Sequence, residues 1–273
     1  MIVYPHSKIN LGLHVIRRRD DGFHELETLF YPLDLCDALE IIPATDGITE
    51  FTSSGNLIPG DINDNLCVKA WDILNSDYEL PPVKIHLHKK IPVGAGLGGG
   101  SSDAAFSLKL LNELFDTNLS KEKLQQYAEQ LGSDCSFFLE NSPVYATGRG
   151  EIMSPYRISL KGYSLVLVKP GIHVSTADAY AGITPKQPEN PLKDILSLPI
   201  EKWKDLLTND FEETIFRKFA EPGEIKSRLY EMGAVYACMS GSGSSVFGIF
   251  RGNPPENTRE KFAQYFVWQQ ELK

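Results

Sequence analysis

A glycine-rich segment from Lys89 to Ala105, KKIPVGAGLGGGSSDAA, contains the residues best suited to bind a phosphate. Its five glycines lie within seven residues, and they are Gly94, Gly96, Gly98, Gly99 and Gly100. Glycine has no Cβ and tolerates positive φ, so such a run lets backbone N–H groups converge on an anion. The next three residues, Ser101, Ser102 and Asp103, are of types that cap a helix or occupy its first turn. The segment therefore predicts a loop and a helix N-terminus that together bind phosphate.

The residues on either side of the glycines indicate a strand before them and a helix after them. Val83, Ile85 and Leu87 alternate with polar residues, which is typical of a half-buried strand. After the glycines, apolar residues recur at helical spacing, at positions 104, 105, 108, 111 and 115. A flexible linker is the alternative, but linkers do not usually join a regular strand to a regular helix.

Two common phosphate-binding motifs fit this segment poorly. A P-loop requires a Lys directly after its last glycine, and none follows here. Gly94, Gly96 and Gly99 match the spacing of the dinucleotide-binding motif, but Pro92 interrupts the approach. The acid expected about 20 residues later would be Asp116, which follows a predicted helix rather than a second strand. A dinucleotide-binding oxidoreductase is therefore the weaker alternative.

The string PVGAGLGGGSSDAA resembles the ATP-phosphate motif of the GHMP kinases, named for galactokinase, homoserine kinase, mevalonate kinase and phosphomevalonate kinase. The triple glycine with SSDAA looks most like the branch that phosphorylates a cytidine diphosphate-linked methylerythritol in isoprenoid precursor synthesis. The resemblance implies an ATP-binding segment made of Pro92, Val93, Gly94, Ala95, Gly96, Leu97, Gly98, Gly99, Gly100, Ser101 and Ser102.

The N-terminal segment PHSKINLGLHVIRRRDDGFHELETLF resembles the first motif of the same branch. Its alternation predicts a strand in which Lys8 and Asn10 share a face, a pattern that by itself normally indicates a solvated surface. By the resemblance, Lys8 is catalytic, Asn10 supports the substrate site, and Phe23 and His24 recognise cytidine. The family more often has Tyr at position 23, so the stacking face is kept and a phenol hydroxyl is lost.

Two later segments resemble further parts of the family pattern. GSDCSFFL resembles the segment that carries the catalytic Asp, which assigns that role to Asp134. On local sequence alone, Asp134 would be a helix-start charge stabilised by the helix dipole. The family often has Pro where this chain has Ser136. PGIHVSTADAY resembles a segment that contacts substrate through Thr176 and Tyr180, although Thr176 also fits a helix N-cap.

The reaction implied by the resemblance transfers the γ-phosphoryl group of ATP to the 2-hydroxyl of the cytidine diphosphate-linked methylerythritol. Phosphoryl transfer depends on charge neutralisation and in-line positioning more than on covalent catalysis. Asp134 would accept the hydroxyl proton, and Lys8 would neutralise the developing charge. The expected cofactors are ATP and Mg²⁺. The metal ligands are not evident, and Ser102 is the nearest candidate in the loop.

Composition limits the classes of partner. The chain has 273 residues, of which 42% are hydrophobic and 23% charged, as is typical of globular proteins. A net charge of −9 argues against a broad nucleic-acid or anionic-membrane surface. The four cysteines lack zinc-binding spacing, and we find neither a signal peptide nor a membrane-length apolar run. We therefore expect a cytoplasmic protein with a small-molecule substrate, no nucleic-acid or membrane partner, and a monomeric or weakly dimeric state.

The whole chain predicts a two-domain α+β fold with a boundary near residue 155, giving domains 1–155 and 156–273. By resemblance, the first half is ribosomal protein S5 domain 2-like and the second is ferredoxin-like. In the second half, the SGSGSS turn at 240–245 resembles the third family motif, which closes over the phosphate site. The NDFE string at 209–212 resembles a family signature that we interpret as structural. A last helix is expected from about 255 to 266.

Two alternatives within the kinase superfamily remain at this point. A GHMP kinase for another small alcohol, such as homoserine or mevalonate, would share the glycine segment but would not need Phe23 and His24. A catalytically inactive member that only binds ligands would not be expected to retain both Lys8 and Asp134. The oxidoreductase alternative is distinguished by whether NAD(P) or ATP protects the protein against heat.

Overall fold

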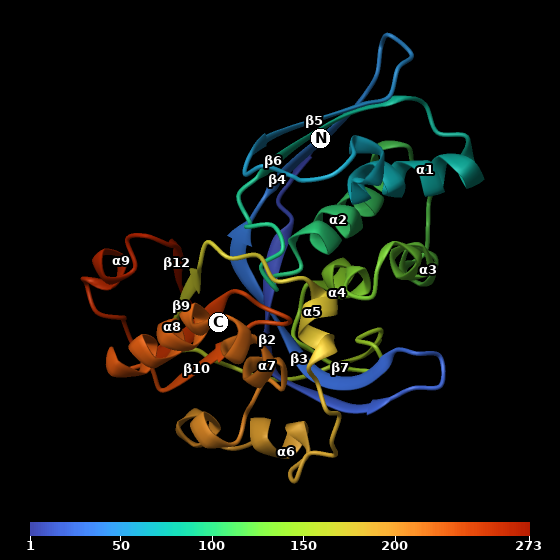
Figure 1. Cartoon of the computed structure of the whole chain (residues 1–273). Coiled ribbons are helices and arrows are strands. Elements are labelled where there is room, and N and C mark those ends of the chain that lie inside the picture. The colour runs from blue at the N-terminus through green and yellow to red at the C-terminus, as the bar shows by residue number, and fades with distance from the viewer. The chain divides into compact units, whose positions relative to one another are not determined.

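The computed structural model describes residues 1–273 and confirms an α+β fold (Figure 1). The residues form two compact units by their contacts. The first unit contains residues 1–8, 32–93 and 98–142, and the second contains residues 9–31, 94–97 and 143–273. No helix combines the length and the apolar character needed to cross a membrane.

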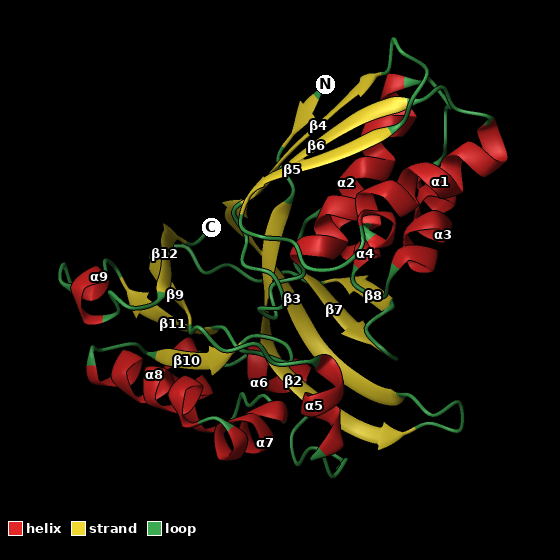
Figure 2. Ribbon diagram, turned by 45° about the horizontal axis from the view of Figure 1, so that its top comes forward, coloured by secondary structure: helices red, strands yellow, loops and turns green.

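The first unit contains a mixed four-stranded sheet. Its strand order is β1 (Ile2–Val3), β4 (Ala38–Pro43), β6 (Val83–Lys89) and β5 (Glu50–Gly55). Strand β6 is antiparallel to β4 and parallel to β5. The short 3₁₀ helix η1 (Ile62–Asp64) precedes four helices that lie on one side of the sheet (Figure 2): α1 (Leu66–Tyr78), α2 (Gly99–Leu114), α3 (Lys121–Leu131) and α4 (Cys135–Glu140).

The apolar faces predicted for this unit form its core. The alternating residues of β6 are buried, and they pack with Leu39 and Ile41 of β4. The helical stripe predicted after the glycines is also buried, including Ala104 and Leu108 of α2. Each fully buried Leu or Ile side chain contributes about 1.5–3 kcal/mol relative to an exposed one, so these stripes hold α2 firmly on the sheet.

Helix α2 is not capped by the serine and aspartate residues that the sequence predicts for this role. Helix α2 begins directly after Gly98, which has φ 69° and provides no side-chain cap. Ser101, Ser102 and Asp103 therefore lie inside the helix, because the last two glycines of the run adopt helical conformation instead of a loop. Helix α1 is capped by Asn65, whose side chain accepts from the backbone N–H of Cys67. Ser120 caps α3.

The second unit contains an antiparallel sheet of order β10 (Tyr236–Met239), β11 (Val246–Arg251), β9 (Tyr163–Lys169) and β12 (Phe266–Glu271). If the four strands are numbered in chain order from β9, their spatial order in the sheet is 2-3-1-4. Helices connect the first strand in the chain to the second, and the third to the fourth. This is the expected ferredoxin-like βαββαβ arrangement. The unit's helical elements are α5 (Thr176–Ala181), α6 (Leu192–Leu196), η2 (Ile200–Asp205), α7 (Phe211–Lys218), α8 (Ala220–Glu231) and α9 (Thr258–Lys261).

The expected last helix is much shorter than the pattern suggested. Helix α9 ends at Lys261, and Phe266 begins β12, which pairs with β9. Phe262 is buried as expected. The reason is tertiary, because β9 would otherwise present an unpaired row of N–H and C=O groups that β12 satisfies.

A third sheet has the order β2 (His6–Arg18), β3 (His24–Cys36), β7 (Val144–Thr147) and β8 (Ile152–Pro155). The expected turn after Arg19 joins β2 to β3. Strands β2 and β3 contribute residues to both compact units. The two units are therefore not separated by a single boundary at residue 155. Strand β3 pairs with β7, and residues from near the N-terminus belong to the second unit.

Candidate active site

Lys8 and Asp134 form an ion pair within the first unit. Lys8 Nζ lies 3.5 Å from Asp134 Oδ2. Lys8 is buried, with 4% of its surface exposed, so it is not the solvated strand residue that its type alone would suggest. Asp134 is the N-cap residue of α4, yet its side chain makes no capping hydrogen bond. The carboxylate is directed to a buried amine, which a purely helix-capping role does not explain.

The N-terminus of α2 lies against the same lysine. A Cβ on Gly98 would lie 3.2 Å from Lys8 Cε and 2.8 Å from Phe138 Cζ, so only glycine fits there. The first N–H groups of a helix have no intrahelical partner, and the positive end of the helix dipole is at the same place. Lys8 therefore adds a positive charge to a helix end that is already suited to bind an anion.

A buried triad that was not anticipated from the sequence fixes this helix end. Lys89 Nζ bonds to Asp37 Oδ2 and Asp103 Oδ2, each at 2.5 Å, and all three side chains are buried. Asp37 Oδ1 also accepts from the backbone N–H groups of Lys90 and Ile91, at 2.6 and 2.8 Å. The triad thus links the end of β6 to α2, on both sides of the glycine segment.

Burial raises the pKa of Asp103 to about 7, against the opposing attraction of Lys89. Asp103 and Asp37 differ in their hydrogen-bond partners, and this difference explains why the proton is placed on Asp103. Asp37 has two backbone N–H donors in addition to Lys89, whereas Asp103 Oδ1 has no hydrogen-bond partner. A single ammonium group cannot compensate two buried carboxylates fully, so the carboxylate with fewer hydrogen-bond donors takes up a proton more readily.

Ser102 is a suitable candidate ligand for a cation. It is fully buried in α2, and its Oγ atom has no hydrogen-bond partner. The protein has no group of three or more His, Cys, Asp or Glu side chains that could hold a metal ion. The Ser102 hydroxyl fits Mg²⁺, because Mg²⁺ usually needs few protein ligands and keeps water and substrate phosphates as the others.

The central part of the glycine segment, residues 94–97, belongs to the second unit and contacts the 240–245 loop. Ser240 Oγ donates to the Gly96 carbonyl at 2.8 Å, and the backbone N–H of Ser245 donates to the Ala95 carbonyl at 3.3 Å. A Cβ on Gly96 would lie 2.0 Å from the Ser240 carbonyl oxygen. Ala95 and Leu97 are buried, and Pro92 and Val93 form the half-buried approach in the first unit. Gly96 is therefore required for close packing of two backbones.

Asn10 lies beside the same loop in the second unit. Its backbone N–H donates to Ser240 Oγ at 3.3 Å, and its side-chain amide donates to Thr28 Oγ1 at 2.9 Å. Thr28 Oγ1 in turn donates to the Gly12 carbonyl at 2.6 Å. The side chain of Asn10 is therefore oriented by a buried neighbour, as a residue that supports a binding site must be.

The residues expected to recognise a base are only partly brought together. His24 stacks on Tyr180, with ring centroids 4.7 Å apart and planes 20° from parallel. Burial and the nearby charge of Arg18 lower the pKa of His24, so its imidazole is neutral near pH 7. Phe23 is 53% exposed, and its ring lies against the guanidinium group of Arg149, 4.7 Å from the centroid.

Thr176 and His173 of the second unit also contact loop residues of the candidate site. Thr176 Oγ1 lies 3.5 Å from Ser242 Oγ, so the start of α5 contacts the 240–245 loop. The exposed His173 has its imidazole against Gly94, where a Cβ would lie 2.5 Å from Nδ1. Sequence reasoning singled out neither His173 nor Arg149, although His173 lies in the PGIHVSTADAY segment that resembles a substrate-contact segment.

Two family models match the chain. The model of the GHMP kinases N terminal domain matches residues 65–141, and the model of the GHMP kinases C terminal domain matches residues 192–267. A Bacteroides fragilis protein named 4-diphosphocytidyl-2-C-methyl-D-erythritol kinase is 52% identical over 276 residues, which cover 100% of both chains. The chain belongs to the GHMP kinases. It is therefore an ATP-dependent phosphotransferase, and the dinucleotide-binding alternative has no support.

Solved structures of GHMP kinases show the same fold. The crystal structure of a 4-(cytidine 5'-diphospho)-2C-methyl-D-erythritol kinase superposes with a TM-score of 0.84 at 35% identity, covering 100% of this chain and 99% of that one. The Methanococcus jannaschii mevalonate kinase gives a TM-score of 0.71 at 15% identity, covering 100% and 98% of the two chains. The mevalonate kinase match shows the fold alone.

Proposed function

We propose that this GHMP kinase transfers the γ-phosphoryl group of ATP to the 2-hydroxyl of 4-diphosphocytidyl-2-C-methyl-D-erythritol, in the methylerythritol phosphate pathway of isoprenoid precursor synthesis. The observation that carries the chemistry is the buried Lys8, paired with Asp134 beside the N-terminus of α2. The substrate is supported by the names of relatives that are similar over the full length of the chain.

Each group in the first unit has one role in the proposed transfer. The substrate oxygen forms a bond to the γ-phosphorus while the bond from that phosphorus to the ADP oxygen breaks. Asp134 takes the hydroxyl proton, because a carboxylate within reach of the substrate can act as a general base. Lys8 and the unpaired N–H groups of α2 offset the negative charge on the transferred group.

The residues present also fit the metal ion that such kinases use. The chemistry that a bound Mg²⁺ would supply is neutralisation of the phosphate charge. In this chain Ser102 would hold it through the unpartnered Oγ atom, and ATP would supply the remaining anionic ligands.

Recognition of the cytidine is assigned to the second unit. A neutral His24 has one ring nitrogen that donates and one that accepts, which matches the edge of a cytosine. Tyr180 and Phe23 offer ring faces for stacking, and Asn10 and Thr176 offer polar groups for the rest of the substrate. Tyr180 already stacks on His24 and thereby orients the imidazole.

A coupled ADP-release assay with a panel of alcohols tests the proposal. We expect turnover with 4-diphosphocytidyl-2-C-methyl-D-erythritol and none with homoserine or mevalonate. MgATP should also raise the melting temperature, since a ligand that binds only the native state stabilises it. Turnover confined to another alcohol would refute the substrate while leaving the phosphotransferase class intact.

A further inference from the structure

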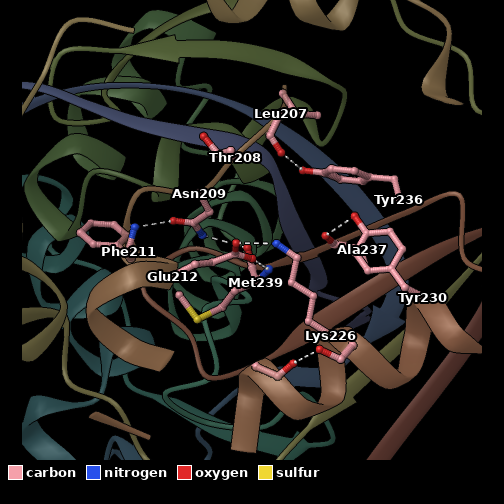
Figure 3. A network of polar contacts seen from close by, with 12 residues as sticks. Leu207, Thr208, Asn209, Phe211, Glu212, Lys226, Tyr230, Tyr236, Ala237 and Met239 are labelled. Carbon is pink, nitrogen blue, oxygen red and sulfur yellow. Dashed lines mark hydrogen bonds and ion pairs between the residues drawn. The ribbon is translucent and has the colours of Figure 1, made fainter. Parts of the chain in front are cut away.

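Asn209 holds the start of the 240–245 loop through both hydrogens of its side-chain amide. Its Nδ2 atom donates to the carbonyl of Met239 at 2.8 Å (Figure 3). The same atom donates to the carbonyl of Gly241, also at 2.8 Å. Its Oδ1 atom accepts from the backbone N–H of Phe211 at 3.0 Å. Asn209 is 2% exposed, so it has no direct contact with solvent-borne ligands and its polar atoms are used inside the protein.

Glu212, three residues after Asn209, also binds Met239 at the start of the 240–245 loop. Its Oε1 atom accepts from the backbone N–H of Met239 at 2.8 Å, and its Oε2 atom pairs with Lys226 Nζ at 2.6 Å (Figure 3). Lys226 lies on α8. Met239 is thus held at both its N–H and its carbonyl group by residues of the NDFE string.

The same string is also bonded to the strand that carries Asn10. The backbone N–H of Leu13 donates to the Thr208 carbonyl at 2.9 Å, and the N–H of Asp210 donates back to the Leu13 carbonyl at 2.9 Å. The Asp210 carboxylate accepts from the N–H of Val15 at 2.8 Å. Residues 208–212 therefore connect β2 and the 240–245 loop through short, buried hydrogen bonds.

We propose that Asn209 is a positioning residue for phosphoryl transfer: it fixes the position of the 240–245 loop against residues 94–97 and Asn10. Asn209 binds the carbonyls of Met239 and Gly241, the two residues on either side of Ser240. Ser240 Oγ then binds the Gly96 carbonyl and accepts from Asn10. The inference rests on the proposed kinase function and on the ATP-binding role that the family resemblance assigns to residues 94–97.

The test replaces Asn209 with Asp. Asp keeps the oxygen that accepts from Phe211 and substitutes an oxygen for the amide that donates to two carbonyls. A displacement of about 1 Å can cost about 10²-fold in rate. We expect kcat/KM for ATP to fall by about that factor in Asn209→Asp. Asn209→Ser, which can donate to only one carbonyl, should show a smaller loss and serves if the Asp variant does not fold.

Lys226→Met is the matched control. It removes the ion pair of Glu212 but leaves Glu212 Oε1 on the Met239 N–H, so it should lower the melting temperature and leave kcat/KM for ATP near the wild-type value. Wild-type kinetics in both Asn209 variants would overturn the proposal. So would equal rate losses in Asn209→Asp and Lys226→Met at equal losses of melting temperature.

Hydrogen exchange and calorimetry separate this inference from the proposed function. Amide exchange should become faster at residues 243 and 245 in Asn209→Asp, and it should stay unchanged where β9 pairs with β11. ATP affinity should also fall, measured without any acceptor substrate. If the wild-type protein binds ATP but does not phosphorylate the cytidyl alcohol, the proposed substrate fails. Unchanged ATP affinity in Asn209→Asp removes the positioning role whatever the acceptor.

Discussion

At the scale of a single residue, Asp134 shows how a neighbour decides between two interpretations of one side chain. Its position at the start of α4 is typical of a helix cap, but it forms no cap hydrogen bond. Its partner is Lys8, which lies on a strand far away in the sequence. A general base normally contributes about 10²–10⁴-fold to the rate, far more than a structural ion pair would.

Asp134→Asn should therefore lower kcat by about 10²–10⁴-fold with little change in melting temperature. Asn has the same size but cannot take a proton, and no cap bond is lost. Ser120→Ala is the control in the same unit, because Ser120 does cap α3 and its loss should cost about 1 kcal/mol of stability at normal kcat. An Asp134→Asn enzyme with wild-type turnover would show that this carboxylate is not the base.

His24 is the residue on which discrimination of the substrate depends. His24→Ala should raise KM for the cytidyl substrate by about 10-fold or more, because it removes a hydrogen bond and part of a stack. KM for ATP should stay the same. In the wild-type protein, KM for the cytidyl substrate should be flat above pH 7 and rise in acid, since the pKa of His24 is lowered and only the neutral ring can accept. Equal changes in both KM values would contradict a cytidine-specific role.

At the scale of an element, the glycine segment combines two kinds of glycine. Gly94, Gly96 and Gly98 have positive φ, whereas Gly99 and Gly100 lie in the first turn of α2. Side chains at Gly98 and Gly99 would collide with neighbours, while at Gly100 the nearest atom to a Cβ would be 3.9 Å away. The density of glycine in the sequence therefore has two separate causes, backbone conformation and close approach.

Gly98→Val should weaken ATP binding by about 10-fold or more, because a β-branched residue at positive φ is strained by about 1–3 kcal/mol and would displace Lys8. Gly100→Ala is the control, since Ala favours a helix and has open space there. Calorimetric titration with MgATP measures both variants. Equal affinities for all three proteins would contradict the phosphate-binding role of this turn.

At the scale of the whole molecule, the buried triad should make stability depend on pH. The pKa of Asp103 is raised in the folded state to about 7, above its ordinary value of 3.8. The folded protein therefore holds a proton that the unfolded chain releases between those values. The contribution of Asp103 to the free energy of unfolding is present at low pH and is lost as pH rises towards about 7.

Urea unfolding of wild type and Asp103→Asn at pH 5, 6, 7 and 8 measures this effect. We expect the wild-type protein to lose stability relative to Asp103→Asn as pH increases over this range, with little further change above the pKa of Asp103. The comparison cancels the contributions of other carboxylates. A difference between the two proteins that stays constant from pH 5 to pH 8 would contradict this, because it would mean that Asp103 is already ionised in the folded state over the whole range.

Local sequence determined those features that depend on periodicity and on special residue types. The alternation of β6, the stripe of α2, the Ser120 cap and the order of strands around the SGSGSS turn are all local patterns, and the structure has them. The glycine segment and the family motifs were equally evident, because their chemistry requires particular residues at fixed spacing. Family membership and the phosphotransferase activity follow from these motifs.

Only the tertiary structure determined which distant residues meet. The triad of Lys89, Asp37 and Asp103 joins segments with no local signal for one another, and so does the contact of Asn209 with the 240–245 loop. Residues 266–271 became a strand because the edge of β9 lies next to them, not because their own pattern required it. Pairing across long sequence separations depends on where the backbone brings unsatisfied groups and buried charges, which a one-dimensional pattern does not contain.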